Sequence, residues 1–379
     1  MEWLELGIKP SSYISALCQS VFRLEPFTTC SYGCLYCYAR WYRGPPGKPI
    51  IKWHVARLFE KVAAKLPGDK PRPLFRLATL SEPFQHASGD HVPGVVKALL
   101  RVSLKHSVPV IVNTKGPLRD RELFSILLSL ADHQLLVVQV TIAFSDEISL
   151  ILEPKAPLPS ERLAMIEELK EHAVPVVARV QPLIPGLEDE HTWAVTEALE
   201  HGAQGVIGEP LRETLQGLRQ IYRLLGLRLD ESLWEDYQLG LEEKREPLLH
   251  PRRSWRARIH SALEALTARH GKPYAPCKDM VLAGFTWFRP GRTCCLEWLG
   301  LREEPLLRPT LNEYALLGWP KEPPWKLCSR LGWPYNCGLE ELEAYPKPIR
   351  KAMVMHMRRL WRLIESERLA LLLSRLTLH

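Results

Sequence analysis

Short apolar runs alternate with amphipathic segments along roughly the first 225 residues of the chain. The apolar runs are bounded by turn-forming residues, a pattern that predicts buried strands. The segments between them carry apolar side chains at helical spacing, as Val55, Leu58, Phe59 and Val62 do. Buried strands separated by such helices predict a parallel sheet with helices packed on its faces. We expect strands at 20–24, 73–80, 108–113, 135–144, 174–180 and 204–208, and helices at 55–66, 120–130, 160–172 and 190–201.

The number of these strand–helix units defines the expected fold class. Six units are two fewer than the eight of a closed barrel, so we expect an α/β fold, a partial (βα)6 TIM-type barrel. No G-x-G-x-x-G motif follows the first expected strand, which argues against a dinucleotide-binding sheet.

The composition changes near residue 227. Eight of the twelve tryptophans and five of the nine cysteines lie beyond this point, where no further strand–helix alternation is evident. Helical patterns at 254–270 and 349–373 flank a middle rich in Pro, Trp and Cys. We therefore expect two domains, the barrel at 1–226 and a mainly helical, Cys- and Trp-rich cap or auxiliary domain at 227–379.

Composition and charge narrow the class of protein. The 379 residues are 46% hydrophobic and 25% charged, as in ordinary globular proteins, and the net charge of +7 is compatible with an anionic partner. The first residues lack the pattern of a signal peptide, and the longest apolar stretch, 135–144, is shorter than a membrane span. We expect a cytoplasmic protein with no membrane partner. The 32 prolines and three asparagines suggest a thermophilic source.

The most informative motif is a group of three cysteines, Cys30, Cys34 and Cys37, spaced C-x3-C-x2-C. It follows the first expected strand directly, at the end of the sheet where barrel enzymes carry their chemistry. Three thiolates suit a soft metal centre, whereas a structural zinc site needs a fourth ligand and commonly has paired C-x2-C knuckles. On a four-iron cluster, three cysteines leave one iron open. A zinc knuckle and plain buried thiols are the alternative interpretations.

This loop and its position resemble the radical S-adenosylmethionine (radical SAM) superfamily, and within it the branch of spore photoproduct lyase and the DNA repair photolyase-like proteins. The resemblance extends from about Val21 to Leu225. It implies that Cys30, Cys34 and Cys37 ligate a [4Fe–4S] cluster whose open iron binds SAM. One electron, supplied by an external donor, then cleaves SAM to methionine and a 5′-deoxyadenosyl radical, which abstracts hydrogen from the substrate.

The resemblance assigns roles to residues of the first two strand ends. Tyr36 matches the family position near the adenine, and Tyr38 matches a tyrosine that returns hydrogen to the cofactor; ordinary core aromatics are the alternative. Glu82, in Thr79–Gln85, matches the segment that binds the SAM amino group, with helix capping as the alternative. Spore photoproduct lyases place a hydrogen-donating cysteine in this segment. This chain has no cysteine there, which argues against thymine-dimer reversal by the same mechanism.

The next strand ends supply three further candidates. Lys115 resembles the lysine of the branch's T-K-S…R-D run and would pair with the SAM carboxylate, unless it is a solvated surface lysine. Thr141 matches a hydroxyl that contacts the methionine part of SAM, with an ordinary sheet threonine as the alternative, and Arg179 matches the strand-five pattern. Glu153 and Arg162 resemble the E-P-x-A-P…R-L signature and are expected to form a structural ion pair.

The C-terminal region offers two weaker signals. A second metal site, a [4Fe–4S] cluster or zinc, is one interpretation of its cysteines, and disulfides or free thiols are the other. Arginines flank Trp361 and Trp255, a combination that suits nucleic acid, whereas the alternative is a helix that packs its apolar face into the core. The cysteines are Cys277, Cys294, Cys295, Cys328 and Cys337, the arginines are Arg252, Arg253, Arg256, Arg258, Arg358, Arg359 and Arg362, and the apolar face is Met353, Met357, Leu360 and Ile364.

Together these features predict a radical SAM enzyme that acts on a large substrate, with nucleic acid favoured because a partial barrel leaves an open side and the C-terminus is basic. Radical modification of a protein or peptide, aided by an auxiliary cluster, is one alternative. A non-catalytic iron–sulfur or zinc protein that binds nucleic acid is another.

Overall fold

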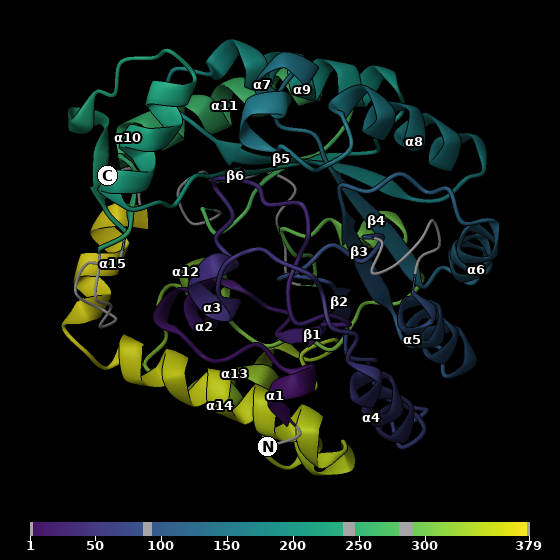
Figure 1. Cartoon of the computed structure of the whole chain (residues 1–379). Helices are drawn as coiled ribbons and strands as arrows, with labels where there is room; N and C mark the ends of the chain where they lie inside the picture. Colours follow the sequence, from purple (N-terminus) through teal and green to yellow (C-terminus); the bar gives the residue numbers. More distant parts are fainter. Residues whose placement is uncertain (1–2, 86–92, 238–246, 280–290, 377–379) are drawn as a thin grey trace.

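The computed structural model describes residues 3–85, 93–237, 247–279 and 291–376. Seven strands form one parallel sheet in the order β1-β2-β3-β4-β5-β6-β9 (Figure 1). Every pairing in this sheet is parallel. Strands β1 to β6 pair in the order of the chain, and β9 pairs with β6, so the expected partial barrel is confirmed. The strands are β1 Phe22–Leu24, β2 Phe75–Leu77, β3 Val110–Thr114, β4 Leu136–Thr141, β5 Val176–Leu183, β6 Val206–Pro210 and β9 Tyr274–Pro276.

Helices cover the outer face of the sheet (Figure 1). In α4 the side chains of Val55, Phe59 and Val62 are buried, as the helical spacing predicted. Burying each of these side chains stabilises the folded chain by about 1.5–3 kcal/mol. A segment this short is only marginally helical in isolation, so the helix is stabilised mainly by this packing. The covering helices are α4 Trp53–Ala63, α5 Gly94–Lys105, α6 Arg121–Asp132, α8 Pro159–Glu171, α9 Glu188–Glu200 and α11 Arg253–Arg269. Helices α7 Asp146–Leu152 and α10 Leu215–Leu224 pack in a separate cluster with residues that follow β4, β5 and β6.

The inner face of the sheet has its own apolar core, to which five strands contribute one residue each. The segment 291–306 closes this core at the amino ends of the strands. Its Leu296 is fully buried, and Arg302 donates a backbone hydrogen bond of 3.1 Å to Gln134 just before β4. Because one end of the barrel is closed in this way, the carboxyl ends of the strands carry the open cavity. The inner residues are Ile111, Val137, Val177, Ile207 and Ala275.

The sheet has one strand more than the six expected, which corrects the predicted count. The extra strand, β9, comes from beyond residue 227 and pairs with β6, so the sheet crosses the boundary expected at residue 226. Sequence pattern alone could not identify it, because three residues ending in a proline give no periodicity. Division of the chain into two domains at residue 226 stays a prediction.

The rest of the C-terminal region is mainly helical, as expected. Helix α14, Lys347–Ile364, packs across α1 Trp3–Leu6 and α2 Ser12–Leu17, close to the N-terminus (Figure 1). Its Met353, Met357 and Leu360 are fully buried, which confirms the core-packing interpretation of this helix. The other helices of the region are α11 Arg253–Arg269, α12 Leu311–Leu316, α13 Pro324–Leu331 and α15 Arg368–Leu376, and β7 Trp234–Asp236 pairs with β8 Leu249–Pro251.

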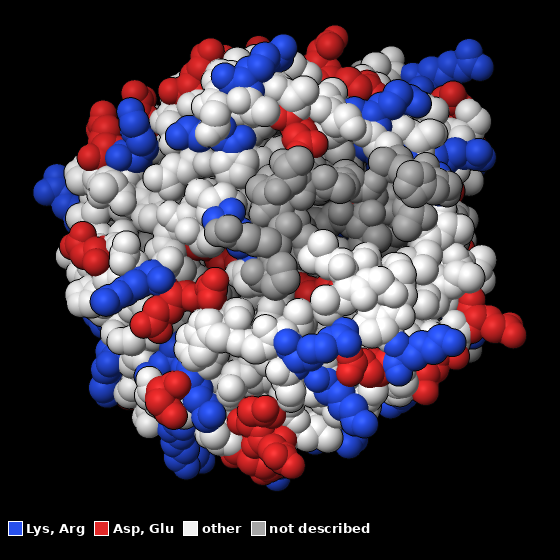
Figure 2. Space-filling view, turned by 180° about the vertical axis from the view of Figure 1, so that it is seen from behind, with Lys and Arg blue, Asp and Glu red and all other residues white. Residues whose placement is uncertain are grey.

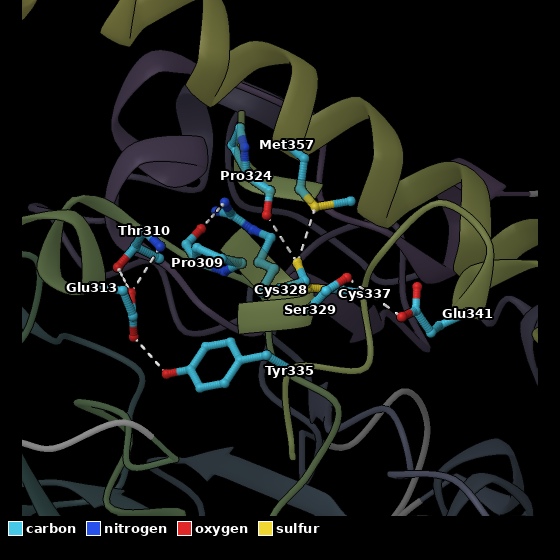
Figure 3. Close-up of a disulfide and its surroundings, with 11 residues drawn as sticks. Pro309, Thr310, Glu313, Pro324, Cys328, Ser329, Tyr335, Cys337, Glu341 and Met357 are labelled. Carbon is cyan, nitrogen blue, oxygen red and sulfur yellow. Dashed lines mark hydrogen bonds between the residues drawn. A yellow bond between two sulfur atoms is a disulfide. The ribbon is translucent and has the colours of Figure 1, made fainter. Parts of the chain in front are cut away.

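Two of the cysteines proposed for a second metal site form a disulfide instead. Cys328 in α13 is bonded to Cys337, and both are fully buried beside Met357 of α14 (Figure 3). A disulfide sulfur carries no thiolate, so neither residue is available as a metal ligand. This bond corrects the five-cysteine site. In the described part of the chain, no helix is long and apolar enough to span a membrane.

Candidate active site

A cavity of about 780 Å³ lies at the carboxyl ends of the strands. Its wall brings together residues from six strand ends and from the cysteine loop, although they are far apart in the sequence. The residues that the sequence predicted for the cluster and for SAM all lie on this wall. They are Cys30, Cys34, Cys37, Tyr36, Tyr38, Glu82, Lys115, Thr141 and Arg179.

The cysteine loop is held in place by Gln85, a fully buried residue that follows β2. The Gln85 side chain accepts a hydrogen bond from Ser31 N (2.7 Å) and donates one to Thr29 O (3.0 Å). Within the loop, Cys37 N donates to Cys34 O at 3.1 Å. Gln85 thus joins the loop to the second strand end. The sequence analysis assigned Gln85 no role. The only feature that could have pointed to it is its position two residues after the Glu82-Pro83 pair.

The donor set and its surroundings fit an anionic iron–sulfur cluster. Arg43 lies beside Cys37, with Nη2 3.7 Å from its sulfur, while Arg43 Nε and Nη1 are buried without a partner among the described residues. Thiolate and sulfide sulfurs would satisfy these donors. Burial raises the pKa of the Cys30 and Cys34 thiols, and a bound metal would deprotonate them. As their side chains lie, no three Cys, His, Asp or Glu of the described chain form a ready metal site, so the thiols would have to reorient.

Glu82 joins the second and third strand ends below the cavity. Its buried carboxylate accepts hydrogen bonds from Thr114 Oγ1 (2.5 Å), Lys115 N (2.7 Å) and Phe84 N (3.0 Å). Burial raises the pKa of Glu82, and these donors act in the opposite direction. Only glycine fits at Gly116, because a Cβ there would lie 2.9 Å from Phe84 Cβ and 3.2 Å from Glu82 Oε1. This close approach brings Lys115 to the cavity wall.

Lys115 belongs to a buried polar network and is not a solvated surface lysine. Its Nζ donates to Tyr36 Oη (2.9 Å) and Glu153 Oε1 (3.0 Å), and Tyr36 Oη also donates to Glu153. Glu153 and Arg162 form a fully buried ion pair, as predicted. Burial alone would raise the pKa of Glu153, but Arg162 and Lys115 outweigh it and bring the pKa to about 2. A ligand of Lys115 must therefore share it with Glu153.

The remaining predicted residues occupy separate strand ends. Tyr38 Oη donates to Thr79 O, just after β2, and burial raises the Tyr38 pKa. Thr141 ends β4, and its carbonyl accepts a hydrogen bond of 3.0 Å from Arg162 Nη1. Arg179 of β5 donates to Gln139, Gln181 and Glu209.

No protein-family model matches the chain. Uncharacterized proteins of Mycobacterium tuberculosis (strain ATCC 25618 / H37Rv) and Mycobacterium bovis are each 29% identical over 216 residues, which is 52% of this chain and 61% of theirs. An uncharacterized protein of Acidianus two-tailed virus is 29% identical over 153 residues, or 38% of this chain and 49% of that protein. The chain thus matches about three fifths of the length of its mycobacterial relatives.

Solved structures of spore photoproduct lyase superpose on about two thirds of the chain. A cysteine-to-serine mutant of that lyase aligns with a TM-score of 0.53 and 15% identity over 67% of this chain and 76% of that one. The lyase in complex with a dinucleoside spore photoproduct aligns with a TM-score of 0.51 and 14% identity over the same shares. The chain has the spore photoproduct lyase fold. The resemblance drawn from the cysteine loop is therefore confirmed at the level of the fold.

On this spore photoproduct lyase fold, the extra strand β9 adds a thiol to the cavity that sequence reasoning did not place there. Cys277 follows β9 directly and lines the wall. Its thiol hydrogen-bonds with Cys294, which lowers the Cys277 pKa to about 5, with Lys278 and Arg179 acting in the same direction. Cys294 and Cys295 lie in the inner core beside it. No metal site among these three thiols is apparent in the described chain.

Two members of the basic–aromatic group around Trp255, which was proposed for nucleic acid, have a structural role instead. Trp255 is buried and donates from Nε1 to Glu188 at 2.6 Å, and Arg256 is buried in an ion pair with Asp279. Neither of these two side chains can stack on or contact an external strand, which corrects the interpretation for them, whereas Arg252 and Arg258 are exposed. On the face seen in Figure 2, acidic and basic side chains are interspersed and form no basic stripe among the described residues.

Proposed function

We propose that this protein is a radical SAM enzyme. The observation that carries the proposal is the convergence of the C-x3-C-x2-C loop and six further sequence-matched residues on one cavity at the carboxyl ends of a partial barrel. Cys30, Cys34 and Cys37 would hold a [4Fe–4S] cluster with one open iron, and with SAM and an electron from an external donor such a cluster would supply reductive SAM cleavage and hydrogen abstraction from the substrate.

The chain's own contribution to this chemistry is to bind, orient and exclude water. Cys30, Cys34 and Cys37 would hold the cluster, and Arg43 would donate hydrogen bonds to its sulfurs. In this proposal Glu82 would accept a hydrogen bond from the SAM ammonium group and Lys115 would pair with the SAM carboxylate, and each is anchored by a neighbouring strand end. The buried Glu153–Arg162 pair fixes Lys115 and Tyr36, so that ligand binding needs little rearrangement of this wall.

We favour nucleic acid as the substrate. Nine cations and only two carboxylates line the described cavity, so the field inside it attracts anions. Arg358 and Arg362 of α14 are exposed and leave a basic helix face near the N-terminal segment. If nucleic acid binds here, the logarithm of the affinity for a DNA or RNA oligonucleotide should fall linearly with the logarithm of the salt concentration; a salt-independent affinity would contradict this substrate. The cytoplasmic location and the thermophilic source stay predictions.

The structure bears differently on the two alternative functions, a peptide-modifying enzyme and a non-catalytic metal protein. A peptide-modifying enzyme with an auxiliary cluster is weakened, since Cys328 and Cys337 are joined to each other. A non-catalytic iron–sulfur or zinc protein would bind metal through the same three cysteines without turning over SAM.

Iron content tests the metal part of the proposal independently of turnover. Anaerobically reconstituted protein should hold about four irons per chain with the absorbance of a [4Fe–4S] cluster. A Cys34→Ala variant should lose most of the iron, whereas Cys18→Ala, which changes a buried thiol outside the cavity, should keep it. One zinc and no iron in the wild type would contradict the proposal.

A further inference from the structure

Three cations surround one carboxylate on the wall formed by β5, β6 and β9. Glu209 of β6 accepts a hydrogen bond from Lys278 Nζ at 2.6 Å, lies 3.4 Å from Arg179 Nη2 and also pairs with Arg212. The three cationic side chains are only 13–18% exposed, and all line the cavity. Glu209 and Arg212 are three residues apart, whereas Arg179 and Lys278 are distant in the sequence and meet them because the ends of β5, β6 and β9 are adjacent.

The charges in this cluster do not balance. Arg179, Arg212 and Lys278 all pair with the single carboxylate of Glu209, so positive side chains outnumber negative ones in this cluster. An unpaired charge in a partly dehydrated site is costly, and an anion from outside removes that cost. The cavity wall is therefore built to receive a negative group.

Arg212 and Lys278 have donors to offer such a group. The hydrogen bonds of Arg212 go to Tyr237 Oη (3.0 Å) and Glu209, which occupy two of its five N–H groups. Lys278 uses one of its three donors on Glu209. Arg179, by contrast, is already bonded to Gln139 and Gln181.

The backbone and the aromatic neighbours hold these donors in place. Lys278 has a φ of +66°, a left-handed conformation that is unfavourable for lysine and often marks a functional site. The guanidinium of Arg212 lies 5.1 Å from the ring centre of Tyr237 and 5.9 Å from that of Tyr38. Because Tyr38 directly follows Cys37, the cationic cluster adjoins the cysteine loop.

We propose that Arg212 and Lys278, supported by the charge of Arg179, bind a phosphate ester group of the substrate. A phosphate group matches the cluster better than a carboxylate, because it carries up to two charges and more acceptor oxygens, and the planar fork of arginine binds it through two hydrogen bonds. This inference rests on the proposed function for the statement that the ligand is a substrate. The anion-binding site itself does not depend on it.

The test is direct binding to the full chain without a cluster, measured by isothermal titration calorimetry. The probes are inorganic phosphate, thymidine 5′-monophosphate, the dinucleotide thymidylyl-thymidine and unphosphorylated thymidine. We expect the monophosphate to bind at least roughly tenfold more tightly than thymidine, and Arg212→Gln and Lys278→Gln each to weaken it by roughly tenfold. Arg219→Gln, which removes an exposed cation outside the cavity, is the control and should change the affinity less than about twofold.

The two esters distinguish a terminal phosphate from a chain phosphodiester. Binding of the dinucleotide equal to that of the monophosphate indicates a phosphodiester of a nucleic acid, and preference for the monophosphate indicates a nucleotide-like substrate. Equal binding of thymidine and its monophosphate would overturn the inference. A second result would also overturn it: methionine displaces the phosphate, and both variants bind methionine more weakly than the wild type. The site would then hold the SAM carboxylate.

The variants need a check of folding, because both residues are partly buried. Arg212→Lys keeps the positive charge but loses the planar guanidinium that makes two hydrogen bonds. If this variant has a melting temperature within a few degrees of the wild type, it should retain part of the phosphate affinity. Failure of SAM cleavage with intact phosphate binding would overturn the proposed function alone. Intact SAM cleavage without phosphate binding would overturn this inference alone.

Discussion

The substitution Glu153→Gln tests the buried network behind Lys115 and Tyr36. It keeps the shape and most hydrogen bonds of the side chain but removes the charge that Arg162 and Lys115 face. Glu153 and Arg162 are fully inaccessible to solvent, so water cannot screen the loss. Removing one partner of a buried ion pair typically costs about 3–5 kcal/mol.

The pKa of Glu153 provides a second measure of the same quantity. Its value in the folded protein is about 2, against 4.5 in the unfolded chain. The charged form is therefore favoured by folding, and the difference corresponds to about 3 kcal/mol. This stabilisation is fully present above pH 4.5 and is lost as the pH falls through 2. Since glutamine cannot titrate, the wild type and the variant should converge as the pH falls.

Urea unfolding followed by circular dichroism measures this effect. We expect the free energy of unfolding of Glu153→Gln to be lower than that of the wild type by about 3 kcal/mol at about pH 7, with a smaller difference at about pH 3. Glu231→Gln, which breaks the exposed pair with Arg219, is the control and should cost no more than about 1 kcal/mol. A Glu153→Gln variant within about 1 kcal/mol of the wild type at neutral pH would refute the reasoning.

Three further predictions follow from the fold and the surface. Replacing Cys328 and Cys337 by alanine opens a loop of sequence separation 9 and should cost about 2–3 kcal/mol in thermal unfolding; no loss relative to the wild type would show that the bond does not form in solution. Gly300→Ala would place a Cβ 2.4 Å from the carbonyl oxygen of Leu136 and should lower the free energy of unfolding in urea by roughly 1–3 kcal/mol. Gly68→Ala, where the added Cβ meets open space, is the control and should be neutral. Equal effects of the two substitutions would contradict the closure of the inner core by the segment 291–306. Arg362→Gln, which removes an exposed cation of α14, should reduce the salt dependence of oligonucleotide binding by about one ion, and an unchanged slope would place the nucleic acid elsewhere.

The first six strands and the cysteine loop were predictable because their information is local. Each strand contains a run of apolar residues, and the three cysteines of the motif lie within one short stretch of the chain. The residues that follow the strands could be matched one by one, since the carboxyl ends of parallel strands all lie on the same side of the sheet. For the same reason, nine residues chosen from the sequence line one cavity.

Features that depend on which residues meet or become buried in the folded chain were not predictable. Strand β9 has only three residues and is defined by its backbone pairing with β6. The partner of Cys328 could not be deduced from spacing, because five cysteines allow many pairings. The burial of Trp255 and Arg256 was not predicted, because local composition does not say which face of a helix is buried.

The cationic cluster around Glu209 illustrates the same limit within the site. Arg179 was assigned from a strand-end match, but its neighbours Arg212 and Lys278 lie beyond β6 and β9 and carry no motif. Their significance comes from the charge balance in the folded chain, which a sequence pattern does not contain.

Formation of 5′-deoxyadenosine tests the central claim most directly. Protein reconstituted with iron and sulfide under anaerobic conditions is mixed with SAM and dithionite, and the nucleoside is measured by mass spectrometry. We predict 5′-deoxyadenosine in the wild type and in Cys18→Ala, and none above background in Cys30→Ala. Equal yields from wild type and Cys30→Ala, or no product from a wild type that holds its full complement of about four irons, would contradict the account.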